Sequence, residues 1–178
     1  MTSLTAFTVL VALVALERLA ELVVSNRNAA WSFARGGRET GQGHYRFMVV
    51  LHSGFLVAML VEAWVRRPQV PPTLAWTMLA LVLAAQALRW WCIATLGRRW
   101  NTRVIIVPGL PPVTSGPYRF LSHPNYVAVV VEGIALPLVH GAWITAVVFT
   151  VANAALLVVR IRVENAALRT LPGRFADA

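Results

Sequence analysis

The sequence predicts an all-α integral membrane protein with five transmembrane helices, the last two forming a tight helical hairpin, and a short cytoplasmic interfacial helix. Hydrophobic residues make up 58% of the 178 residues and charged residues only 13%, a balance typical of a membrane protein. Five apolar runs set the number of helices. The arginines gather in alternate connections between these runs, which is the pattern of cytoplasmic segments.

The first helix is expected over residues 4–24, an apolar run that exceeds the roughly 20 helical residues needed to cross a bilayer. Glu17, Arg18 and Glu21 lie near its end. Snorkelling or a local ion pair is the simplest interpretation of these charges, and a functional role is the alternative, because charges inside a membrane are rare. Residues 25–46 are polar and predict the interfacial helix, followed by a turn at Gly41-Gln42-Gly43.

Two more spans are expected over residues 47–65 and 74–96, joined by a short proline-rich connection. His52 lies on the first of these, where a hydrogen-bonded packing residue is the preferred interpretation and a ligand the alternative. Trp90 and Trp91 near the end of the second indicate an interfacial aromatic belt. Cys92 is the only cysteine, which excludes an intramolecular disulfide and a cysteine metal cluster.

The C-terminal part begins with residues 104–107, a β-branched run that predicts a short extended segment. Residues 126–139 and 142–159 are apolar and predict the last two helices. Because only His140 and Gly141 are left to connect them, we expect a tight hairpin. Residues 160–167 are expected to continue the last helix into water.

Residues 113–126 hold the densest cluster of polar and turn-forming residues. Gly116-Pro117 predicts a turn, and Ser122-His123-Pro124 predicts a helix start, because proline fits the first helical position. The free N–H groups of that helix start would lie beside Tyr118 and Tyr126 and can hold an anion. An ordinary loop with a capped helix is the alternative interpretation.

The arginine distribution predicts the topology. Residues 25–46, residues 97–123 and the segment after residue 159 each contain four arginines, whereas the alternate connections contain only Arg66 and Arg67. The positive-inside rule therefore places these three segments in the cytoplasm and the N-terminus outside, with five crossings. The net charge of +9 is explained at the membrane surface, with membrane lipids as partners, and no nucleic-acid partner is expected.

This topology places residues 113–126 and the end of the last helix on the same side of the membrane. Arg160 and Glu164 are one helical turn apart, and a solvated i,i+4 salt bridge is their simplest interpretation. Opposite the helix start at His123, they would instead ring a pocket with an apolar floor. Such a pocket suits a polar cofactor from the cytosol and an apolar substrate from the bilayer.

These motifs resemble the isoprenylcysteine carboxyl methyltransferase family and its prokaryotic relatives. The likeness covers residues 90–168 and depends on residues 113–118 (Val-Thr-Ser-Gly-Pro-Tyr), residues 123–126 (His-Pro-Asn-Tyr), and the Arg160 and Glu164 pair. It implies an S-adenosylmethionine-dependent enzyme of the bacterial plasma membrane, with a cytoplasmic cofactor site and no metal. By position, the cofactor would be lined by Val113, Tyr118, His123, Pro124, Asn125, Tyr126 and Glu164, with backbone contacts from Leu110, Pro111 and Pro112. Arg160 would face the methyl acceptor.

In this interpretation, residues 1–178 form a single domain with a three-helix part (1–97) and a cofactor-binding part (98–178). Ser122 and Asn165 differ from the basic and acidic residues that many relatives have there. The region around Glu17 and His44 resembles bacterial relatives that methylate alkylresorcinols or alkylpyrones, which implies a lipophilic acceptor with a phenolic or enolic hydroxyl. An isoprenylcysteine-type carboxylate is the alternative. We expect no dedicated base, because the resemblance assigns His123 and Glu164 to the cofactor.

Two other functions stay open at this point. Membrane sterol and steroid reductases resemble the Gly-Pro-Tyr and His-Pro-x-Tyr motifs, so an NADPH-dependent reductase is one alternative. The short chain and the spacing of Arg160 and Glu164 favour methyl transfer. A non-catalytic lipid-binding or transport protein is the other alternative, in which Glu62, Arg89 and Glu132 would line a path through the bundle.

Overall fold

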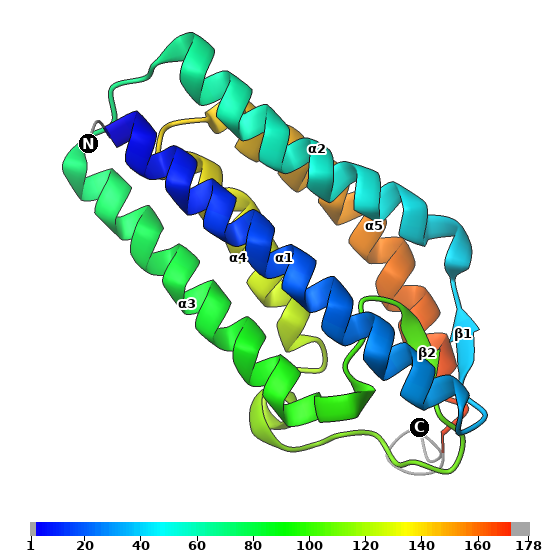
Figure 1. The fold of residues 1–178 in the computed structure, drawn as a ribbon. Coiled ribbons are helices and arrows are strands. Elements are labelled where there is room, and N and C mark those ends of the chain that lie inside the picture. The colour runs from blue at the N-terminus through cyan, green and yellow to red at the C-terminus, as the bar shows by residue number, and fades with distance from the viewer. Residues whose placement is uncertain (1–2, 172–178) are drawn as a thin grey trace.

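The computed structural model describes residues 3–171 and is a bundle of five α-helices with a two-stranded sheet at one end (Figure 1). The start of the first helix and the end of the last lie at opposite ends of the bundle. The elements in chain order are α1 Ser3–Phe33, β1 Arg38–Thr40, α2 Gln42–Arg66, α3 Pro72–Leu96, η1 Gly97–Arg99, β2 Val104–Ile106, η2 Gly116–Arg119, α4 Pro124–Leu138 and α5 Trp143–Leu168.

The first helix is longer than predicted. The expected break between a span ending at residue 24 and a separate interfacial helix is wrong, because α1 continues to Phe33. Its last turns are held by polar bonds to the loop after α3: Asn28 donates to the carbonyl of Trp100 at 2.8 Å, and Ser25 Oγ lies 2.8 Å from Asn101 Oδ1. These buried polar contacts stabilise a segment whose polarity had indicated a solvated surface helix.

The two short strands tie the α1–α2 connection to the loop after α3. They pair antiparallel, with Arg38 opposite Ile106 and Thr40 opposite Val104. The extended segment predicted over residues 104–107 is therefore confirmed over β2. Its partner was not predicted, because the three residues of β1 carry no β-branched run.

Three helices within residues 3–171 are long and apolar enough to cross a bilayer, namely Gln42–Arg66, Pro72–Arg99 and Trp143–Leu168. The apolar helix α4 has 15 residues. Large apolar side chains cover the outside of the bundle; Val50 is 71% exposed and Trp76 is 69% exposed. An outer surface of this kind indicates an integral membrane protein.

The apolar core and the polar interior occupy different parts of the bundle. The core joins Phe7 and Val11 of α1 to Met59 of α2, Leu136 of α4 and Phe149 of α5. Toward the sheet, the interior becomes polar instead. This polar part positions the candidate site.

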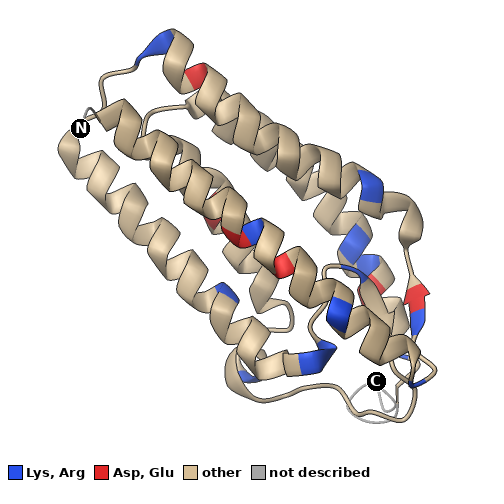
Figure 2. Cartoon of the chain, in the orientation of Figure 1, with Lys and Arg blue, Asp and Glu red and all other residues tan. Residues whose placement is uncertain are grey.

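Arg18 and Glu21 of α1 form ion pairs inside the bundle. Arg18 donates to both oxygens of Glu21 at 2.7 and 2.8 Å and to Glu132 of α4 at 2.8 Å. Arg89 of α3 donates twice to Glu21 at 2.5 Å, and Gln86 donates to Glu17. The local ion pair is thus confirmed and extends into a network across three helices, in which Glu21 is 3% exposed. Figure 2 shows basic and acidic positions close together midway along the bundle.

Glu62, near the end of α2, caps the start of α5. Its carboxylate accepts from the backbone N–H of Ile144 at 3.1 Å, from Thr145 N–H at 2.8 Å and from Thr145 Oγ at 2.7 Å. Arg66 adds an ion pair at 2.6 Å. These bonds satisfy N–H groups that have no partner inside α5.

We expect the substitution Glu62→Ala to lower the free energy of unfolding by about 1–3 kcal/mol, because it leaves these N–H groups without an acceptor. The measurement is the thermal unfolding midpoint of the purified protein in detergent. Glu62→Gln keeps one acceptor oxygen and should lose less. If Glu62→Ala and Glu62→Gln lowered the thermal unfolding midpoint equally, this result would contradict the capping role of Glu62.

Candidate active site

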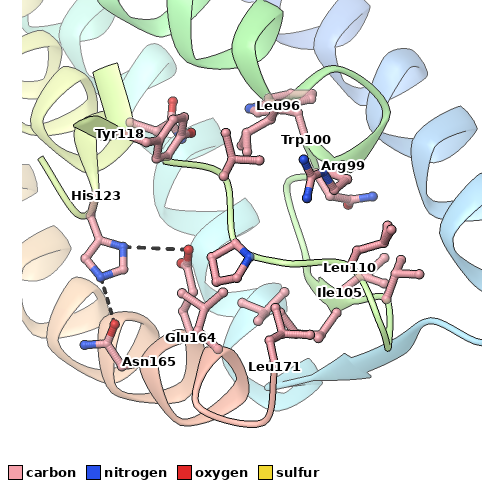
Figure 3. Close-up of a pocket in the computed structure, with 18 of the residues that line it drawn as sticks. Leu96, Arg99, Trp100, Ile105, Leu110, Tyr118, His123, Glu164, Asn165 and Leu171 are labelled. Atoms are coloured by element: carbon pink, nitrogen blue, oxygen red, sulfur yellow. Dashed lines mark hydrogen bonds and ion pairs between the residues drawn. The ribbon is translucent and has the colours of Figure 1, made fainter. Parts of the chain in front are cut away.

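A cavity of about 390 Å³, which we call the outer cavity, lies at the end of the bundle that carries the sheet (Figure 3). The loop that follows α3, the start of α4 and the end of α5 form its walls. Its volume falls in the range of roughly 300–1,000 Å³ found for small-molecule sites. The structure thus brings residues 110–126 and residues 160–165 together in one cavity.

Most of the predicted site residues line the outer cavity. They are Leu110, Pro111, Pro112, Val113, Tyr118, His123, Asn125, Tyr126, Arg160 and Glu164. Pro124 does not line it. This residue is fully buried at the first turn of α4, so its position supports the helix start and not a direct ligand contact.

The local sequence explains how the loop reaches the cavity. Gly116 has φ +55°, and a Cβ there would lie 2.5 Å from Thr95 Oγ, so only glycine lets the loop cross the end of α3 this closely. Pro117 is buried behind it in η2. Pro124 occupies the start of α4, with His123 at its N-cap position. The predicted turn and helix start are both confirmed.

Arg160 and Glu164 are linked through Tyr126 and do not pair directly. The Tyr126 hydroxyl donates to Glu164 and accepts from Arg160 Nε at 2.8 Å. Arg160 also donates to the Thr102 carbonyl at 2.7 Å and approaches Met48 Sδ at 3.3 Å. The simple i,i+4 salt bridge is therefore wrong. Among the described residues, Arg160 is ion-paired with no carboxylate, although it is only 7% exposed.

His123 faces the end of α5. Its Nδ1 lies 3.7 Å from Glu164 Oε1, and its Nε2 lies 2.9 Å from Asn165 Oδ1 (Figure 3). The interaction with the Glu164 carboxylate raises the pKa of His123, which favours the imidazolium form. Burial, with the neighbouring Cys92 thiol, raises the pKa of Tyr118, so that phenol keeps its proton.

The raised pKa of His123 makes part of the stability depend on pH. Because the folded-state pKa lies above the unfolded value of about 6.5, the contribution is fully present below that pH and is lost as pH rises through the raised pKa. We expect the difference in thermal midpoint between the wild type and His123→Gln to be largest at acidic pH and to disappear above the raised pKa. A difference independent of pH would show that the contact involves only neutral histidine.

The structure adds residues to the outer cavity that the sequence interpretation missed. They follow α3 directly and include Arg99, Trp100, Asn101 and Arg103. Arg99 donates to the carbonyl of Pro111 at 2.7 Å and so holds the proline loop. The tryptophans had marked the end of α3, but no local pattern indicated that the chain then turns back over the cavity.

A second cavity of about 200 Å³ lies within the bundle, and we call it the inner chamber. It shares part of its wall with the outer cavity. The residues that line both are Trp100, Asn101, Asn125, Tyr126 and Arg160. Arg160 and Tyr126 therefore lie in the wall between a cavity at the end of the bundle and a chamber between the helices.

The fold defines a mostly helical membrane protein, and its interior holds two adjoining cavities. Residues 78–170 match the isoprenylcysteine carboxyl methyltransferase (ICMT) family, and the chain belongs to this family. The family implies methyltransferase activity, and its members use S-adenosylmethionine as methyl donor.

Two curated relatives extend the likeness over most of the chain. The uncharacterized protein YpbQ of Bacillus subtilis (strain 168) is 35% identical over 164 residues, covering 92% of this chain and 96% of the relative. An uncharacterized protein of Haemophilus influenzae (strain ATCC 51907 / DSM 11121 / KW20 / Rd) is 27% identical over 155 residues, covering 86% and 90% of the two chains. No solved structure matches the chain.

Proposed function

We propose that this protein is an integral membrane, S-adenosylmethionine-dependent O-methyltransferase whose acceptor is a lipophilic molecule with a phenolic or enolic hydroxyl. The observation that carries the proposal is the position of Arg160, a buried cation with no carboxylate partner among the described residues, in the wall between the outer cavity and the inner chamber. A methyl donor in the outer cavity and a methyl acceptor in the inner chamber would meet at Arg160.

The lining of the outer cavity supports a site for the methyl donor. The donor carries an amino-acid group, a sulfonium and an adenosine. Glu164 and His123 offer charges of both signs, whereas Leu110 to Val113 and Tyr118 offer apolar surface and backbone groups. When bound, the donor supplies an electrophilic methyl group. The chain positions it and excludes water, which carries much of the rate of an in-line displacement.

Arg160 would bind the reacting oxygen of the methyl acceptor. Its charge can stabilise an oxyanion that develops on a phenol or enol, and this supports an alkylresorcinol or alkylpyrone. The guanidinium fork also suits a carboxylate held by two parallel hydrogen bonds. An isoprenylcysteine-type carboxyl group is therefore the second candidate acceptor.

The proposed topology has five crossings with α4 and α5 as a hairpin, the N-terminus outside, and the C-terminus and site in the cytoplasm of a bacterium. Figure 2 supports this orientation, because most arginines gather at the end of the bundle with the sheet, and Arg66 and Arg67 lie at the other end. Only residues 139–142 connect α4 to α5. Arg174, counted in the tail, lies outside the described residues.

A membrane path lined by Glu62, Arg89 and Glu132 has less support. Glu62 is engaged in capping α5, whereas Arg89 pairs with Glu21 and Glu132 pairs with Arg18. The three side chains therefore belong to two separate polar clusters.

Calorimetric binding and a methyl-transfer assay on the purified protein test the proposal. We expect S-adenosylhomocysteine to bind and NADPH not to bind. Labelled methyl groups should transfer to alkylresorcinol or alkylpyrone in a panel that also contains farnesylcysteine and a fatty acid. Binding of NADPH alone would instead indicate a reductase, and binding of neither would indicate a non-catalytic protein.

A further inference from the structure

The inner chamber is suited to a molecule with an apolar body and a polar head. Val14, Phe55 and Leu157 line it with apolar surface. Leu22 of α1 and Val49 of α2 also line it, and they are 36% and 43% exposed. This partly exposed apolar lining suits an apolar chain that extends from the chamber toward the lipid.

His52 of α2 lines this chamber with one nitrogen unengaged. Its Nδ1 lies 2.8 Å from the carbonyl oxygen of Met48. Because a carbonyl oxygen only accepts, Nδ1 carries the proton, and Nε2 of the neutral ring has a free lone pair. Within residues 3–171, no group forms a hydrogen bond with Nε2. The ring is fixed by edge-on packing against Phe149, with centroids 5.2 Å apart.

Met48 contacts both His52 and Arg160. The backbone carbonyl of Met48 orients His52, and its sulfur lies 3.3 Å from Arg160 Nη1. Met48 of α2 therefore contacts both His52, whose Nε2 is unengaged, and Arg160, which has no direct ion pair. The two groups border the same chamber.

The other ionisable groups that face the chamber already have hydrogen-bond or ion-pair partners. They come from α1, α2, α3 and α4 and are Arg18, Glu21, Tyr45, Arg89, Tyr126 and Glu132. Glu21 is bound by both Arg18 and Arg89, and Glu132 is bound by Arg18. Neither carboxylate is free to take a proton without breaking an ion pair. Glu132 binds Arg18 through Oε2 only, so its Oε1 is the competing proton acceptor, and His52 is the one base among these groups that is in no ion pair.

We propose that His52 is a catalytic base, whose Nε2 takes the proton of an acceptor hydroxyl in the inner chamber while Arg160 holds the resulting oxyanion. The proposal rests on the proposed methyltransferase function and selects a hydroxyl acceptor over a carboxylate, which needs no base. It replaces the expectation that no dedicated base exists.

The step balances in atoms and charge. The O–H bond breaks and its proton passes to Nε2, which makes His52 an imidazolium. The acceptor oxygen bonds to the methyl carbon as the carbon–sulfur bond of the sulfonium donor breaks, and that electron pair stays on sulfur. The products are a methyl ether and a thioether, and the proton on His52 leaves to water with them.

The test compares two acceptors with the same alkyl chain, a resorcinol that is neutral at the assay pH and a nitrophenol that is already ionised. We expect His52→Phe to lower kcat/KM for the resorcinol by about 10²-fold and to leave that for the nitrophenol within about threefold, because an ionised acceptor needs no base. His52→Gln should give the same contrast. The matched control is His140→Phe, since His140 is buried against Phe7 and lines neither cavity. It should leave both values unchanged.

Binding of S-adenosylhomocysteine, measured on every variant, separates this proposal from the methyltransferase function. Equal losses for the two acceptors, or no loss for either, would overturn the role of His52. Wild-type transfer to farnesylcysteine and to no phenol would also overturn it while leaving methyl transfer intact. Wild-type protein that fails to bind the donor analogue would overturn the methyltransferase function, and the role of His52 with it.

Discussion

Replacing Arg160 by alanine is expected to lower kcat for methyl transfer by about 10³-fold, the upper end of the loss seen when a stabilising group is removed from an oxyanion. The side chain is buried in the wall between the two cavities and forms no direct ion pair with a carboxylate among the described residues, because Glu164 reaches it only through the Tyr126 hydroxyl. An oxyanion in the inner chamber would be its natural counter-charge. Initial rates with labelled donor at saturating acceptor measure the effect.

Two further variants test whether the loss of activity comes from the charge of Arg160, from its planar guanidinium or from its position on the helix. Arg160→Lys keeps a cation but loses the planar fork, so we expect an intermediate loss of about tenfold to 10²-fold. Arg162→Ala removes an exposed arginine two positions along the same helix and should have no effect. If Arg160→Ala abolished binding of S-adenosylhomocysteine together with activity, Arg160 would maintain the outer cavity and not act on the acceptor.

Replacing Glu21 by alanine is expected to cost about 3–5 kcal/mol of unfolding free energy, because breaking a buried ion pair leaves a charge without compensation. Arg89 is 8% exposed and donates two hydrogen bonds to Glu21. Without that carboxylate, its remaining side-chain bond is a 3.4 Å contact to Asn125. The unfolding midpoint of the purified variant in detergent measures the loss.

Glu17→Ala is the matched control for this prediction. Glu17 lies one turn earlier on α1 but is more exposed; it accepts from the neutral groups of Gln86 and Trp90 and has only a long ion pair, at 3.7 Å, with Arg18. Its removal should cost about 1 kcal/mol, the typical value of a hydrogen bond. The double variant Glu21→Ala with Arg89→Met should recover part of the loss, because it removes the stranded charge as well. A cost for Glu21→Ala no larger than that of the control would argue against the network.

Glu21 and Arg89 contribute both to the stability of the bundle and to the wall of the candidate site. Their network connects α1, α3 and α4 and lines the inner chamber. A variant that loosens it is therefore expected to change the chamber as well as the bundle. For this reason, the His52 comparison uses residues outside the network.

Local signals in the sequence predicted most of the helices and the loop at the site, but they placed the end of α1 too early. The apolar runs and the proline at the start of α4 predicted where helices lie, because each depends on backbone geometry within a few residues. Gly116 predicted its turn for the same reason. Motif spacing then indicated the family, which the comparison confirms.

Only the tertiary structure decided which polar groups meet. The extension of α1 depends on bonds from Asn28 to a loop 72 positions away, and Tyr126 enters between Arg160 and Glu164 from another helix. Arg89 takes Glu21 as its partner and leaves Glu132 to Arg18. Hydrogen bonds and ion pairs act through space over a few ångströms, so partners distant in the chain leave no periodic signal in it. The apolar runs determine that helices form, and their packing determines which charges lie opposite one another.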